Sequence, residues 1–119
     1  KKYGYESTDP EYALEKLRLA IFDLTIGEGN IKERLLTATK NLTELSENHF
    51  PEPLRQDWNY IFTRLTKKES PENVRKYGEG NFDATICGMR KSTASKIAID
   101  IVIIDQQLYN YIKEGLWPQ

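Results

Sequence analysis

Apolar positions recur at spacings of three and four along most of the chain, which is the period of one face of a helix. The first such run follows Asp9, Pro10 and Glu11, which are residue types that begin helices. Its apolar stripe consists of Leu14, Leu17, Ile21 and Leu24. We expect this helix to end near Ile26, with Gly27 supplying a left-handed residue.

A second helix is predicted after the turn GEGN at residues 27–30. Asn30 stands three residues before Glu33, the spacing of a capping box, in which each side chain accepts a hydrogen bond from the other residue's backbone amide. The apolar stripe of this helix consists of Ile31, Leu35, Ala38, Leu42 and Leu45. Because the turn is short, the two helices should pack as an antiparallel pair.

A third helix is predicted after a connector that contains Pro51 and Pro53. Its stripe consists of Leu54, Trp58, Ile61, Phe62 and Leu65. The aromatic residues Trp58, Tyr60 and Phe62 are expected in the core. The start signal Ser-Pro-Glu at 70–72 then predicts a short helix that ends before Gly78.

The letters GEGN occur a second time at residues 78–81. The residues after this copy do not align with those after the first, so we interpret the two copies as one turn sequence used twice rather than as a repeat. Residues 79–91 are compatible with a loop or a short helix.

The stretch KIAIDIVIID at 96–105 has two periodicities. Its isoleucines alternate as in a strand, but a helical stripe also continues through the whole segment, with no turn residue between Ser92 and Gly115. That stripe consists of Ala94, Ile97, Ile101, Ile104, Leu108 and either Tyr111 or Ile112. We predict a helix over Ser92–Glu114 with Ser92 as its N-cap. Ile99, Val102 and Ile103 add apolar residues outside the stripe, so this helix should be buried on more than one side.

These elements predict an all-α fold, an antiparallel bundle of four main helices plus one short helix, with the long C-terminal helix at its centre. A chain of 119 residues fits a single domain over 1–119. Residues 1–8 are expected to form a flexible N-terminal arm and residues 115–119 a C-terminal tail.

Composition changes this picture in two ways. The net charge is only −1, but the segment 64–96 holds eight basic and four acidic residues, so it carries +4 and the rest carries −5. This basic segment keeps nucleic-acid binding open as an alternative, although no recognition motif is present and the overall charge makes it the weaker one. The single cysteine, Cys87, cannot form an internal disulfide and favours a reducing cytoplasm.

Catalytic and metal-binding patterns are missing from the sequence. The only histidine, His49, has no second histidine or cysteine nearby, so we expect a surface or loop residue, no metal site and no catalytic residues. The stretch GEGNFDATICGMRKST matches neither a dinucleotide turn nor a Walker loop, and no cofactor is implied. A small anionic ligand remains an alternative at the predicted start of the last helix. The candidate residues there are Arg90, Lys91, Ser92 and Thr93.

The C-terminus is crowded with large apolar side chains. Tyrosine and tryptophan are common anchors of protein interfaces. The interface candidates are Tyr109, Tyr111, Leu116 and Trp117. We therefore expect a small non-enzymatic interaction or regulatory module, self-associating as a homodimer or bound to another protein. An anion- or nucleotide-binding protein is the alternative. The apolar part of the last helix is too short to span a bilayer, so no membrane partner is expected.

The stretches GEGNFDATICGM and IAIDIV, with LTELSENHFPEPLRQDWNYIFTRLT before them, resemble small bacterial helical proteins without an assigned activity. The resemblance implies a bacterial, cytoplasmic origin and carries no function across.

Overall fold

The computed structural model describes residues 9–67 and 82–117, and in these residues every regular element is a helix. The main helices are α2 (Pro10–Ile26), α3 (Ile31–Thr39), α4 (Glu52–Thr66) and α7 (Lys91–Lys113). A short 3₁₀ helix, η1 (Glu47–His49), precedes α4, and the short helix α6 (Phe82–Cys87) precedes α7. The predicted all-α bundle of four main helices and a short one is confirmed. The short helix expected near 70–77 lies outside the described residues.

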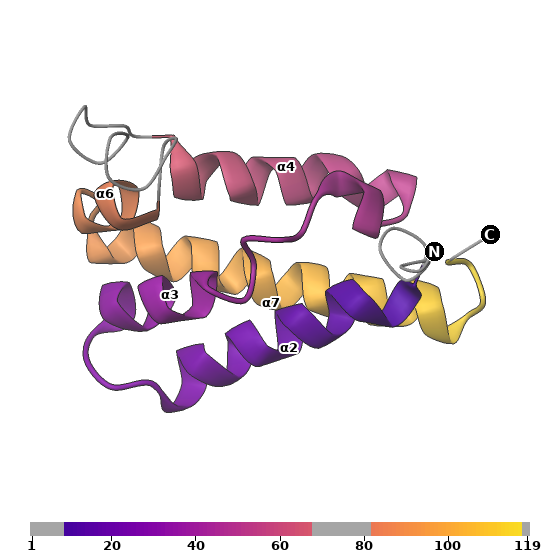
Figure 1. Cartoon of the computed structure of the whole chain (residues 1–119), viewed down its shortest axis with the longest axis horizontal. Helices are drawn as coiled ribbons and strands as arrows, with labels where there is room; N and C mark the ends of the chain where they lie inside the picture. Colours follow the sequence, from indigo (N-terminus) through magenta and orange to yellow (C-terminus); the bar gives the residue numbers. More distant parts are fainter. Residues whose placement is uncertain (1–8, 68–81, 118–119) are drawn as a thin grey trace.

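Helix α7 is the central element, as predicted. It packs against α2 and α3 on one side and against α4 on the other, and α6 bridges α3 and α4 (Figure 1). Both α2 and α4 run antiparallel to α7, while α3 runs back along α2 (Figure 1). Five residues of the predicted α7 stripe are buried: Ala94, Ile97, Ile101, Ile104 and Leu108.

The α2–α3 turn confirms one cap and corrects another. Asn30 and Glu33 form the predicted capping box: Asn30 Oδ1 accepts from the Glu33 amide at 3.1 Å, and Glu33 Oε1 accepts from the Asn30 amide at 2.7 Å. Gly27 is extended (φ −62°) rather than left-handed, and the left-handed residue is Gly29 (φ +91°). Gly27 is required for space instead, because a Cβ there would lie 2.5 Å from the Asp23 carbonyl oxygen.

Helix α3 is shorter than predicted. It ends at Thr39, and residues 40–44 form turns, although Leu42 and Leu45 are buried as the stripe requires. The Thr39 hydroxyl donates to the Leu36 carbonyl at 2.6 Å, and the Asn41 amide donates to Asp23 of α2 at 2.9 Å. Such side-chain hydrogen bonds compete with helical ones, which explains the early end.

Four further expectations were wrong. Helix α7 is covered on two sides, as expected, but not through Ile99, Val102 and Ile103, which are 58%, 45% and 47% exposed because its neighbours leave a further side uncovered. Tyr60 is exposed, although Trp58 is in the core. The other two concern His49 and the start of α7.

His49 is buried rather than at the surface: its ring stacks near Tyr12, with 5.0 Å between ring centroids, and its Nδ1 accepts from the Ser46 amide at 3.0 Å.

Helix α7 begins at Lys91, with Arg90 as the capping residue. The Ala94 amide donates to the Arg90 carbonyl at 3.0 Å, so the first turn of the helix already includes Ser92. Ser92 is therefore an exposed residue of the first turn.

The two left-handed glycines of the described residues, Gly29 and Gly115, provide a matched test of the capping box. Gly29→Ala should lower the free energy of unfolding by about 2 kcal/mol, because the left-handed backbone disfavours a Cβ and this Cβ would also collide with the Glu33 carboxylate. Gly115→Ala has the same backbone cost (φ +75°) but meets no atom within 4 Å, so about 1 kcal/mol is expected. Urea unfolding followed by circular dichroism measures both, and equal losses would contradict a role for the cap.

Candidate functional site

The outer side of α7 carries three exposed large apolar side chains, Ile99, Val102 and Ile103. A strip of residues spaced by three or four runs along it: Lys96, Ile99, Ile103, Gln107, Asn110 and Glu114. We call this set the α7 strip. Its four inner members carry no charge, while its ends carry opposite charges. Val102 lies beside the strip and is also exposed.

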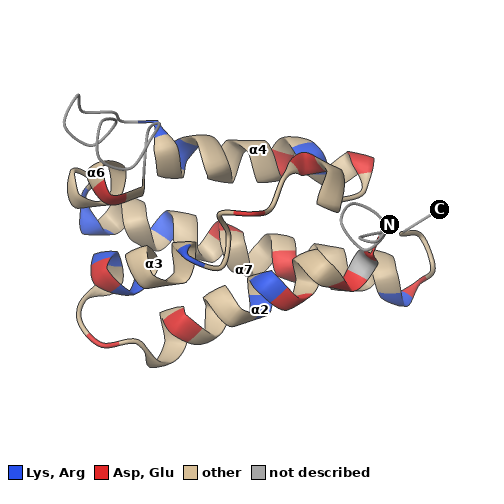
Figure 2. Cartoon of the chain, in the orientation of Figure 1, with Lys and Arg blue, Asp and Glu red and all other residues tan. Residues whose placement is uncertain are grey.

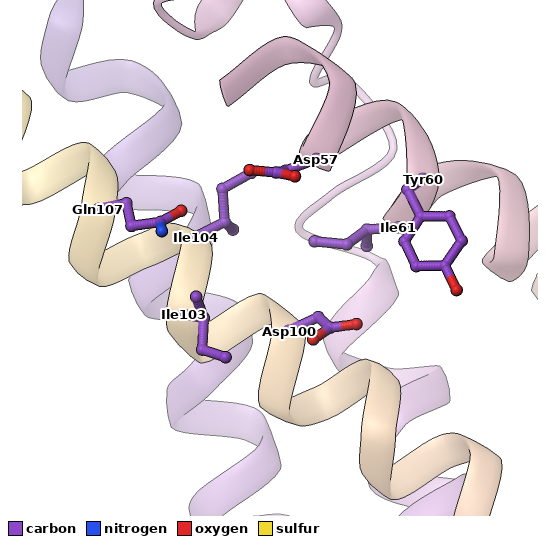
Figure 3. Close-up of a pocket in the computed structure, with 7 residues that line it drawn as sticks. All are labelled: Asp57, Tyr60, Ile61, Asp100, Ile103, Ile104 and Gln107. Carbon is purple, nitrogen blue, oxygen red and sulfur yellow. The ribbon is translucent and has the colours of Figure 1, made fainter. Parts of the chain in front are cut away.

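A groove separates the α7 strip from α4. Its central part has a volume of about 310 Å³ and is lined by Asp57, Tyr60 and Ile61 of α4 and by Asp100, Ile103, Ile104 and Gln107 of α7 (Figure 3). A second cavity of about 470 Å³ shares Asp57 and Gln107 and extends to Leu116. The groove therefore has an isoleucine-rich floor and carboxylates along its sides.

The α4 side of the groove is held by Arg64. Its Nη2 donates to the Asp100 carboxylate, its Nε donates to the Tyr60 carbonyl at 3.4 Å, and its guanidinium lies 4.0 Å from the centre of the Tyr60 ring. The bond between Arg64 and Asp100 links α4 to α7 across 36 positions of the sequence. Tyr60 is thereby held as an exposed aromatic side chain on the α4 side of the groove, across from Ile103 (Figure 3).

On the α2 side, a part-buried ion pair fixes the register of α2 against α7. Arg18 Nε donates to Asp105 Oδ1 at 3.3 Å, and the Arg18 guanidinium lies 5.1 Å from the centre of the Tyr109 ring. Burial raises the pKa of the Asp105 carboxyl above its ordinary value, and the charge and hydrogen bond of Arg18 oppose that rise.

The structure separates the four anion candidates. Arg90 and Thr93 line a cavity of about 330 Å³ whose other lining residues are Arg64, Lys67, Thr85, Gly88 and Met89. We call it the basic pocket. Lys91 lines a different cavity, together with Asn30 and Lys32, and Ser92 lines neither of these two cavities. The sequence did not reveal Arg64 and Lys67 as members of this site, since only the fold brings the end of α4 to the start of α7.

Basic residues gather at the end of the bundle where α4 ends and α7 begins (Figure 2). Arg64, Lys67, Arg90 and Lys91 belong to this described part of the 64–96 segment. Lys68, Arg75 and Lys76 lie outside the described residues, so nucleic-acid binding through the whole segment stays a prediction.

The four interface candidates lie in two environments. Tyr109 and Leu116 are exposed, whereas Tyr111 and Trp117 are half-buried and pack against the core. The Trp117 indole Nε1 is buried without a hydrogen-bond partner among the described residues. A role in association therefore remains a prediction for all four, and for Tyr111 and Trp117 it would overlap with a role in packing.

Within residues 9–67 and 82–117, no group of three metal-ligating side chains comes together, and Cys87 is an exposed free thiol. None of the helices in these residues is both long and apolar enough to cross a membrane. Comparisons with protein-family models, with curated proteins and with solved structures found no match to this chain.

The Arg18–Asp105 pair predicts a pH dependence of stability. A raised pKa means that the folded state holds the proton of Asp105 more tightly than the unfolded chain does. The stabilisation from this proton is therefore full below the ordinary pKa of 3.8 and is lost as the pH rises through the folded-state value. Urea unfolding of the wild type and of Asp105→Asn, from about pH 3 to about pH 7, isolates this effect. The stability of the wild type relative to the variant should fall as the pH rises.

Arg18→Gln should make that fall steeper, because it removes the charge that opposes the rise of the Asp105 pKa. A wild type that instead gains stability relative to Asp105→Asn as the pH rises would show that the Arg18 ion pair outweighs burial.

Proposed function

We propose that the protein is a small non-enzymatic interaction module that self-associates, with the α7 strip as its contact surface. The observation that carries the proposal is the exposure of Ile99, Val102 and Ile103 on the longest helix of the described residues, at 58%, 45% and 47%. Large apolar side chains gathered on one face favour a site of protein contact. A cytoplasmic location belongs to the same proposal, since the exposed thiol of Cys87 suits a reducing compartment.

The charges of the strip favour a second copy as the partner. Lys96 and Glu114 are 18 residues apart, which is five helical turns, so they lie on the same side of α7 about 27 Å from each other. If two α7 helices pack antiparallel about the midpoint at Asp105, each Lys96 faces the other copy's Glu114. The two Ile103 side chains then lie about 6 Å apart along the axis, within contact range of each other.

The surface beside the strip continues the contact. Tyr60 is 60% exposed on the α4 edge of the groove, where Arg64 holds it in place. Tyr109 and Leu116 extend the exposed apolar surface toward the C-terminus. Amides of Gln107 and Asn110 supply hydrogen bonds without adding charge to the centre, which is the composition expected of an interface core.

Ile103→Asp should weaken the dimer at least about tenfold, because it places a carboxylate on the central contact where it would be desolvated. Leu19→Asp is the matched control, since Leu19 is 43% exposed on α2 and lies off the strip. Sedimentation-velocity measurements over a concentration series give both dissociation constants. A dimer that Ile103→Asp leaves unchanged, or a wild type that stays monomeric at all concentrations, would refute the proposed contact.

A charge exchange tests the antiparallel arrangement. Lys96→Glu and Glu114→Lys should each weaken association by about threefold, because each places like charges opposite one another. The double variant restores opposite charges at both ends of the interface, so its dissociation constant should return to near the wild-type value. A double variant weaker than either single variant would exclude this arrangement of the two copies.

A further inference from the structure

The basic pocket lies at one end of the bundle and includes no residue of the α7 strip. Its cationic residues come from two separate parts of the chain: Arg64 and Lys67 at the end of α4, and Arg90 just before α7. The fold thus brings these positive charges together around one cavity. Its volume of about 330 Å³ is within the range of small-ligand sites.

The charge balance of this cavity favours an anion. Among the described residues that line it, none is an aspartate or a glutamate. Arg64 is paired with Asp100, but neither Lys67 nor Arg90 has an ion-pair partner among the described residues. Two like charges at one cavity repel each other, and an anion between them relieves that repulsion.

The remaining lining residues suit an oxygen-rich ligand. Thr93 contributes a hydroxyl that can donate to an anionic oxygen. Thr93 also stands in the first turn of α7, where no side chain caps the helix and no acidic residue is present. The positive end of the α7 dipole therefore adds to the field of the cations at this wall of the cavity.

We infer that the basic pocket binds a small phosphorylated ligand, with the phosphoryl group between Lys67 and Arg90. The Arg90 guanidinium donates hydrogen bonds to two phosphoryl oxygens, and the Thr93 hydroxyl donates to a third. The Lys67 ammonium attracts the phosphoryl group as a point charge. The phosphoryl group is chosen over a carboxylate because its three terminal oxygens match three donor side chains, Lys67 at the end of α4 and Arg90 and Thr93 at the start of α7. No strip residue lines this pocket, so substitutions at Lys67 and Arg90 test it without changing the strip.

The test is a titration of the full chain with inorganic phosphate, pyrophosphate and a short single-stranded oligonucleotide, followed by backbone amide NMR shifts. Saturable shifts at Gly88, Arg90 and Thr93 are expected with phosphate or pyrophosphate. Arg90→Gln and Lys67→Gln should each weaken the binding by about tenfold, because each removes one charge-assisted contact. Lys91→Gln is the matched control: it removes the neighbouring cation, which lines another cavity, and should change affinity less than about twofold.

Three outcomes would overturn the inference. Linear, non-saturating shifts with both phosphates would show that the cavity holds no phosphoryl site. An equal loss of affinity in Lys91→Gln and Arg90→Gln would show a diffuse positive surface. Binding of the oligonucleotide alone, with an affinity that falls steeply as salt rises, would identify a nucleic-acid surface in place of a small-ligand pocket.

Discussion

The whole arrangement depends on the buried stripe of α7. Its five core residues are covered by three different helices, so the burial of one stripe holds α2, α3 and α4 in place together. Burial of large aliphatic side chains is the dominant favourable term in folding, and here one helix shares its buried stripe with three neighbours. A change in the middle of that stripe, at Ile101, would therefore loosen contacts with more than one neighbour at once.

The same geometry creates the exposed face. A helix that contacts α2 and α3 on one side and α4 on the other has one side left toward solvent unless another helix covers it. In α7 this side contains Ile99 and Ile103, which gives the chain an apolar surface that a second copy can cover. The centre of the fold and the proposed contact surface are thus opposite sides of one helix.

The local elements could be predicted from the sequence because their causes are local. The capping box at Asn30, the cap at Asp9 and the spacing of the α7 stripe all depend on residues within a few positions of each other. The burial of Ile99 and Ile103 was predicted wrongly, because periodicity shows which residues share a face and not how many neighbours cover it. The sequence predicted only part of the basic pocket. Arg90 and Thr93 were among the predicted anion-binding residues, but Lys67 lines the pocket only because α4 packs on α7.

Arg64 belongs to both candidate sites. Its guanidinium binds Asp100 and stacks on Tyr60 at the groove, and the same residue lines the basic pocket. A substitution there would alter the edge of one surface and the charge of the other in a single step. Substitutions at Lys67 or Arg90 can therefore change the basic pocket alone, and substitutions at Ile103 can change the groove alone. At Arg64, natural variation is constrained by both sites. The effect of a mutation at Arg64 would combine changes in the two sites.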